Sequence, residues 1–290
     1  MAPRTTAAKR LLPTLILALA TLAALVVPTS PATAAMPGEN GEILVFGGVG
    51  DTRGFYLVSL DPLGISKLPI EAHDLDPNDA AWSPTGDRLA FTRVDPTTDE
   101  RGVWVHDLDS GDTTLLRTAQ PKVQFSSVSW SPDGTELAVA TTRRDAPYTF
   151  SSGLLRLSTD GSLIELIELP SDFVWDVEWQ PTGDRILVNL GWSGEDNYWD
   201  QTSEACLLDV ETKALDCILE SGALWPTWAP DGTRFAAGFD PTGLAIVDTD
   251  GSLVHQFDPR LPGRMATWSP DGRFIAYPWY LGEPEVGQYG

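Results

Sequence analysis

The chain has 290 residues, of which 42% are hydrophobic, and a formal net charge of −22 at pH 7. A negative field of this size disfavours binding to nucleic acids and to anionic membrane surfaces, and it favours cations, basic partners or simple solubility. From the length we expect one closed domain, because the chain is too short to hold a second, catalytic domain beside it.

Residues 1–35 have the pattern of a secretory signal: a basic start, an apolar run over 11–27 and the small residues Ala-Thr-Ala at 32–34. The run is shorter than the ~20 residues that a membrane-spanning helix needs, and the small residues favour cleavage. We therefore expect one mature domain over 36–290 that is exported, either secreted or held in the cell envelope, without insertion into a membrane. An uncleaved membrane anchor is the alternative.

A phrase of the form Trp-x-Pro-Asp-Gly or Trp-x-Pro-Thr-Gly recurs five times after this segment. Its tryptophans lie 48, 49, 49 and 40 residues apart. An even period of this size predicts a repeat architecture with the dimensions of a propeller blade. The five copies begin at Trp82, Trp130, Trp179, Trp228 and Trp268.

Each copy of the phrase predicts a tight turn between two strands. Proline presets φ at the first central position, Asp or Thr suits the second, and Gly accepts a positive φ at the exit. Apolar triplets such as 89–91 and 137–139 follow three residues after the Gly, and they predict a strand that is covered on both faces. Stacked four-stranded blades require this arrangement.

The number of predicted strands favours five blades. Strands that enter the Trp, third strands and fourth strands each number five, whereas second strands number six, because the strand at 43–46 has no Trp before it. We expect the strand around Trp268 to join the N-terminal strands and close the ring, which would remove exposed sheet edges. Six blades, two of them incomplete, are the alternative.

The Trp-Ser-Pro-Asp-Gly phrase, the apolar strand after it and an aliphatic strand ending in Asp-x-Asp-Gly resemble the TolB-like, WD-like β-propeller repeat. The resemblance spans 42–280, and it implies an all-β propeller of four-stranded blades. The same repeat serves periplasmic scaffold proteins, propellers that flank enzymes of the prolyl oligopeptidase type, and some lyases. It therefore implies a fold and no single activity.

The chain has two cysteines, Cys206 and Cys217, on consecutive predicted strands of one hairpin. With Glu211 and Thr212 as a two-residue loop, strand pairing puts the cysteines opposite each other, near the separation that a disulfide needs. We expect a structural cross-strand disulfide, which suits an exported protein. A free, reactive pair is the alternative.

The resemblance implies that two sets of loops gather on one face around the central channel: those from second to third strands, and those from fourth strands to the next blade. The loop within 191–204 combines aromatic, carboxylate and amide side chains, as do surfaces that bind sugars or peptides. A loop folded onto its own tryptophans is the alternative. Two aspartates stand three residues before a repeat Trp, which places them close to the channel. The predicted ligand-binding residues are Asp79, Asp176, Trp192, Glu195, Asp196, Tyr198, Trp199 and Asp200.

A second loop, around 73–79, has the alternate spacing of a calcium loop at Asp74, Asp76 and Asn78. It departs from the helix-loop-helix calcium motif, which needs Gly at the sixth position and Glu at the twelfth, where this chain has Asp79 and Thr85. We expect no cofactor, and a looser calcium site at these three residues is the alternative.

Catalytic patterns are sparse in the sequence. The three histidines are widely spaced, a Gly-x-Ser-x-Gly elbow is missing, and no His and Cys cluster suggests a metal centre. We expect a non-catalytic, monomeric module that binds a protein or peptide with basic residues. The alternatives are a carbohydrate- or small-ligand-binding protein that uses Trp192, Tyr198 and Trp199, and a propeller hydrolase or lyase that uses Asp79 and Asp176.

Overall fold

The structure is a computed structural model that describes residues 41–47, 54–60, 62–70, 80–94, 101–193, 202–220, 222–239, 243–258 and 266–277. All regular elements in these ranges are β-strands. The described ranges accordingly hold no helix that is long and apolar enough to cross a membrane. The predicted signal at 1–35 lies outside them.

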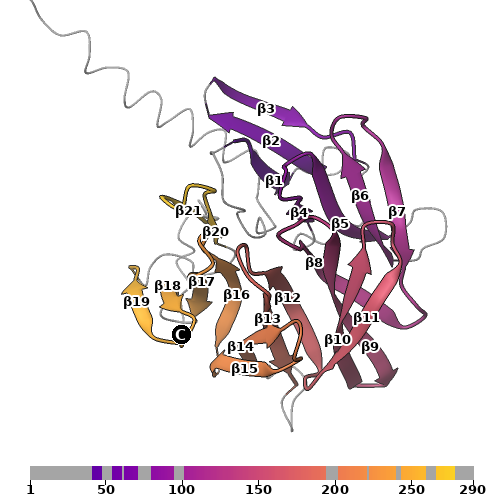
Figure 1. Ribbon diagram of the computed structural model, residues 1–290, viewed down its shortest axis with the longest axis vertical. Coiled ribbons are helices and arrows are strands. Elements are labelled where there is room, and N and C mark those ends of the chain that lie inside the picture. The colour runs from indigo at the N-terminus through magenta and orange to yellow at the C-terminus, as the bar shows by residue number, and fades with distance from the viewer. Residues whose placement is uncertain are drawn as a thin grey trace, which may run out of the picture.

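The strands form a five-bladed β-propeller, which confirms the predicted all-β fold (Figure 1). Blade 1 is a three-stranded sheet of β1 (Ile43–Gly47), β2 (Gly54–Leu60) and β3 (Leu63–Lys67). Blade 2 contains β4 (Ala80–Trp82), β5 (Arg88–Val94), β6 (Arg101–Asp107) and β7 (Thr113–Thr118). Blade 3 contains β8 (Val123–Trp130), β9 (Glu136–Ala146), β10 (Thr149–Ser158) and β11 (Leu163–Leu169). Blade 4 contains β12 (Phe173–Trp179), β13 (Arg185–Trp192), β14 (Thr202–Asp209) and β15 (Leu215–Leu219). Blade 5 contains β16 (Ala223–Trp228), β17 (Arg234–Phe239), β18 (Gly243–Asp248) and β19 (Leu253–Gln256).

A separate hairpin follows blade 5, formed by β20 (Thr267–Trp268) and β21 (Ile275–Ala276). The expected pairing of this segment with the N-terminal strands is not observed in the described ranges, because β20 pairs with β21 and β1 pairs with β2 in another sheet. The reason is local. The turn after Trp268 closes its own hairpin through hydrogen bonds from the Ser269 N–H to the Phe274 carbonyl and from the Gly272 N–H to the Ser269 carbonyl. The position beside β20 that β1 would need is therefore taken by β21.

The repeated turn has the predicted chemistry. In blade 3, the Ser131 hydroxyl accepts a hydrogen bond from the Glu136 N–H at 2.9 Å and donates one to Asp133 at 2.7 Å. The Gly134 N–H closes the turn on the Ser131 carbonyl at 2.9 Å, with φ at 69°. Blade 4 differs, because Gly183 has no positive φ and its N–H lies 3.4 Å from the Gln180 carbonyl oxygen.

The repeat tryptophans connect consecutive blades. The indole N–H of Trp130 donates to the carbonyl of Ala81 at 3.0 Å, and that of Trp228 donates to the carbonyl of Glu178 at 3.2 Å. Each acceptor belongs to the first strand of the preceding blade. Trp130 and Trp228 are both fully buried. The period of the phrase is therefore the period at which neighbouring blades are joined by a large apolar side chain with a satisfied polar group.

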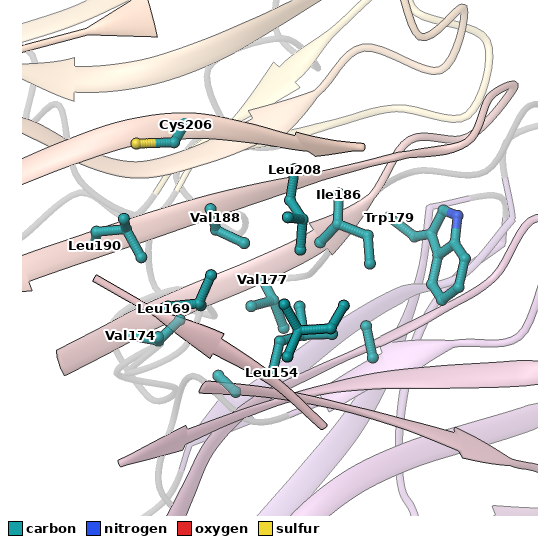
Figure 2. Packing of buried hydrophobic residues seen from close by; sticks show 13 residues of the cluster. Leu154, Leu169, Val174, Val177, Trp179, Ile186, Val188, Leu190, Cys206 and Leu208 are labelled. Atoms are coloured by element: carbon teal, nitrogen blue, oxygen red, sulfur yellow. The ribbon is translucent and has the colours of Figure 1, made fainter. Parts of the chain in front are cut away.

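Apolar side chains fill the seams between blades. Ile186 and Val188 of β13 face blade 3, whereas Leu187 between them packs into the cluster shared with blade 5. Strands β5, β9, β13 and β17 alternate between two clusters in this way, which confirms the predicted coverage of both faces for these four second strands. The prediction is wrong for β21, where Ile275 is only half-buried and Ala276 is exposed. Figure 2 shows the seam between blades 3 and 4, to which blade 3 contributes Leu154 and Leu169 among others.

Candidate functional site

Several strand ends meet at one end of blades 3 and 4, where the β9–β10 connection has only two residues and the β11–β12 connection has three. Ser152 near the start of β10 lies opposite Thr142 of β9 and Leu169 at the end of β11. In blade 4, Gly191 near the end of β13 lies opposite both Phe173 of β12 and Ser203 of β14. The β9–β10 and β11–β12 connections, the end of β13 and the start of β14 therefore share one face, which we call the loop face.

Asp176 lies on the first strand of blade 4 and faces blade 3. Its side chain is 8% exposed. The Ser127 hydroxyl, from β8 of blade 3, donates a hydrogen bond to Asp176 Oδ1 at 2.6 Å, and the Val177 N–H donates to the same oxygen at 2.9 Å. Burial outweighs these two hydrogen bonds and raises the pKa of Asp176 to about 6. The predicted carboxylate near the channel is thus a buried group at the seam between blades 3 and 4.

Three aromatic rings line up at the loop-face end of this seam. The ring centroids of Phe150 and Phe173 are 4.9 Å apart, and those of Phe173 and Trp175 are 5.2 Å apart in a stacked arrangement. Trp175 also lies against Gly191, where an added Cβ would be 2.1 Å from the indole nitrogen. Glycine is therefore required at 191 for the ring to take its place.

Trp192 is half-buried and packs against the apolar cluster between blades 3 and 4. Its indole N–H donates to the carbonyl of Pro170 at 3.1 Å. The next residue is also held, because the Ser193 N–H donates to a carboxylate oxygen of Asp172 at 2.8 Å. Trp192 thus has a packing role, and its part in binding a ligand stays a prediction.

The other predicted site residues lie outside the described ranges. They include the three candidate calcium ligands, so the calcium alternative also stays a prediction. These residues are Asp74, Asp76, Asn78, Asp79, Glu195, Asp196, Tyr198, Trp199 and Asp200.

Ser127 and Asn189 are two polar residues of this region that sequence reasoning missed. Asn189 is 1% exposed, and its amide donates to the carbonyls of Glu204 and Ala223, both at 3.0 Å. Its side-chain oxygen accepts a hydrogen bond from the N–H of Trp225, a non-glycine residue with φ at 43°. An amide inside the apolar run 186–190 was the available signal for Asn189. For Ser127, the signal was its place three residues before Trp130, which matches Asp176 before Trp179.

The predicted disulfide is confirmed. Cys206 and Cys217 lie opposite each other in β14 and β15, with an S–S distance of 2.08 Å. Glu204 has a carboxylate oxygen near both sulfur atoms. Because the sulfurs are bonded to each other, they offer no thiolate to a metal ion.

Carboxylates at the opposite ends of the strands are engaged in turns. In the β10–β11 turn, Asp160 accepts hydrogen bonds from the Ser158 hydroxyl and the Ser162 N–H, and they lower its pKa to about 2. In the β14–β15 turn, Asp209 accepts bonds from the Thr212 N–H and hydroxyl, which lower its pKa below its ordinary value. Part of the high acidic content thus supports local turn structure.

The described histidines lie in different blades. His106 on β6 of blade 2 is buried, its Nδ1 lies 2.9 Å from the Thr113 hydroxyl oxygen, and burial lowers its pKa. His255 on β19 of blade 5 packs edge-on against Phe257. Neither therefore lies beside Asp176 on the first strand of blade 4.

Comparison with known proteins connects the chain to WD-repeat and TolB-type propellers. No family model matches the sequence. The WD repeat-containing protein VIP3 of Arabidopsis thaliana is 28% identical over 116 residues, which are 37% of this chain and 36% of the plant protein. TolB from Acinetobacter baumannii has 17% identity and a TM-score of 0.58 over 79% of this chain and 55% of that chain. A putative TolB from Agrobacterium tumefaciens has the same identity and TM-score over 84% and 88% of the two chains. The match thus spans about a third of the plant protein and about half of Acinetobacter TolB.

Other solved propellers with this fold differ in function. They include a nidogen/laminin complex, at 11% identity and a TM-score of 0.57 over 81% of each chain. An enzyme is also among them, oligogalacturonate lyase in complex with manganese, at 13% identity and a TM-score of 0.55 over 86% of each chain. Identities this low concern the fold alone. The chain therefore has a five-bladed β-propeller fold whose structural neighbours include TolB-type propellers.

Proposed function

We propose that this chain is an exported, non-catalytic propeller that binds a protein or peptide on its loop face. The observation that carries the proposal is the seam between blades 3 and 4. Three aromatic rings, contributed by two blades, stack at its loop-face end, and the buried carboxylate of Asp176 lies further along β12 of the same seam. Aromatic side chains beside a few placed polar groups are common at the centres of protein interfaces. The nidogen/laminin complex is an example of a similar fold in a protein assembly.

Export is supported by the disulfide and by the composition of 1–35. Disulfides persist in oxidising compartments, such as the bacterial periplasm and the extracellular medium. Cys206 and Cys217 form such a bond within blade 4. Mass spectrometry of the chain recovered from culture medium and cell envelope tests this part. A mature chain that begins near 36 supports export with cleavage, and a full-length chain confined to the cytoplasm contradicts it.

A basic partner is supported by the net charge of −22. Opposite charges accelerate the encounter of two proteins, and salt screens the attraction over about 8 Å at physiological ionic strength. The dissociation constant for a partner should therefore rise as salt is increased from about 50 to 500 mM.

The test is capture of partners on the immobilised mature chain from cell-envelope extract, followed by affinity measurements with the identified partner. The variant Tyr148→Ser removes a loop-face side chain that is 75% exposed. The control Leu253→Ser removes a side chain that is 62% exposed on the outer strand of blade 5. We expect weaker binding for the first variant alone. Equal affinities for both variants, together with no effect of salt, would contradict binding on the loop face.

A further inference from the structure

The starting observation is the one-sided hydrogen bonding of Asp176. Its two hydrogen bonds, from the Ser127 hydroxyl and the Val177 N–H, both end on Oδ1. Within the described part of the chain, the structure shows no protein donor for Oδ2, and this oxygen is not among the fully buried polar atoms without a partner, so it keeps some access to solvent although the residue is only 8% exposed. A buried carboxylate is costly unless its oxygens are paired, so this oxygen is where a further donor would stabilise the site.

Two β-bulges hold the carboxylate in place. The register shifts in β8 between Phe125 and Val128, and in β12 between Val174 and Asp176. Ser126, inside the first bulge, donates to the carbonyl of Val174 at 2.7 Å, beside the second. Bulges re-aim side chains and are frequent beside functional sites. Here the two bulges lie side by side across the seam, where Ser127 of blade 3 contacts Asp176 of blade 4, and β16 of blade 5 has a similar shift between Leu224 and Thr227.

The surroundings of the carboxylate suit an organic cation. Phe173 and Trp175 precede Asp176 on the same strand, and Phe150 adds a third ring from blade 3. Ring faces attract ammonium and guanidinium groups, and such groups also donate short hydrogen bonds to carboxylates. Calcium needs six to eight oxygen ligands, whereas the described part of this seam offers one carboxylate oxygen without a donor. A charged side chain therefore fits this site better than a divalent ion.

We propose that Asp176 receives a positively charged group of the partner, an arginine guanidinium or a lysine ammonium, at the seam between blades 3 and 4. This inference rests on the proposed function, because it names the chemistry that the loop face recognises. The cation would donate to Oδ2 and lie near the rings of Phe173 and Trp175.

The experiment uses N-acetyl-arginine amide as the probe and N-acetyl-citrulline amide, its uncharged analogue, as the control ligand. Binding to the mature chain is followed by NMR of the aspartate carboxyl carbons and by tryptophan fluorescence. We expect the arginine probe alone to bind. Its affinity should fall about tenfold between pH 7 and pH 5, because a carboxyl with a pKa of about 6 gains a proton over this range.

Two variants with the same change of net charge separate a local effect from a long-range one. Asp176→Asn should abolish binding of the arginine probe, whereas Asp160→Asn, at an exposed turn of blade 3, should bind as the wild type does. The pH dependence in the wild type provides a test that needs no variant to fold. Equal binding of the arginine and citrulline probes, no binding by either, or full binding by Asp176→Asn would overturn the inference.

The outcomes also separate this inference from the proposed function. A captured partner that binds wild type and Asp176→Asn equally would overturn the cation site and leave the interaction role intact. An arginine probe that binds as expected, in a chain that captures no partner, would support the cation site and contradict the proposed function.

Discussion

Replacement of Asp176 by Asn tests whether this buried carboxylate destabilises the protein at neutral pH. Burial raises its pKa from an ordinary value of 3.8 to about 6. Because the folded-state pKa is raised, the protonated form contributes stability that is fully present below about pH 4 and is lost as the pH rises to about 6. A shift of about 2 units, at ~1.36 kcal/mol per unit, corresponds to about 3 kcal/mol.

The variant Asp176→Asn should lose this pH dependence. The amide oxygen can still accept hydrogen bonds from Ser127 and Val177, and the variant has no charge to desolvate. An amide nitrogen left without an acceptor costs about 1–3 kcal/mol at every pH. The free energy of unfolding of the variant minus that of wild type should therefore rise by up to about 3 kcal/mol between pH 4 and pH 7.

The assay is urea unfolding of both proteins at unit intervals from pH 4 to pH 8, with the disulfide intact. The difference between the two proteins is the informative quantity, because other carboxylates titrate equally in both. A difference that stays constant across this range would show that Asp176 has an ordinary pKa. Burial would then not raise the pKa of this carboxyl.

Three further predictions concern the turns, the disulfide and the aromatic stack. Asp160→Asn should affect the pH dependence of stability in the opposite direction. Because the folded-state pKa of Asp160 is lowered to about 2, its carboxylate stabilises the wild type above pH 4, and this stabilisation is lost as the pH falls towards 2. Urea unfolding of the variant and the wild type over this pH range would show the difference. Reduction of the Cys206–Cys217 disulfide should lower the free energy of unfolding by roughly 3 kcal/mol, measured with and without reductant. Gly191→Ala should displace Trp175 and destabilise the protein by about 1–3 kcal/mol, with a change in near-UV circular dichroism; an unchanged spectrum would contradict the close approach.

Much of the fold could be predicted because its signals are local. Pro, Asp and Gly within a five-residue phrase specify a turn, and the structure shows the bonds of Ser131, Asp133 and Gly134 that such a turn needs. The pairing of Cys206 with Cys217 likewise follows from the length of one hairpin. Interactions of this kind involve residues close in sequence, so the local sequence pattern is enough to predict them.

Features that depend on neighbouring blades could not be predicted. The closure of the ring was one such feature, since two second strands compete for β20 and only the structure shows that β21 occupies the position. The burial of Asp176 was another. It depends on Ser127, 49 residues earlier in the chain, and the residues next to Asp176 on its strand have no pattern that reveals such a partner.

Comparison of the repeats within the chain indicates which parts of the inner strands the fold itself requires. The Trp of the repeated phrase is the same in every copy, and the indoles of Trp130 and Trp228 join neighbouring blades. Three residues earlier the copies differ, and the equivalent positions hold Asp79, Ser127, Asp176, Trp225 and Met265. The propeller therefore forms with a hydroxyl, a carboxylate or an indole at this place, and no single residue type there is needed for the blades to pack.

A residue that lowers stability, where the fold tolerates other residues, is expected to act in function. Asp176 meets both conditions, because its burial penalises the charged form and its counterparts in blades 3 and 5 are uncharged. The same penalty prepares the site for a cation. A positively charged group that pairs with the carboxylate restores the interaction that the seam lacks, so the energy lost in the free protein is recovered on binding. Asp176→Asn should therefore improve stability at neutral pH and weaken binding together, and a variant that changed only one of these would break the connection.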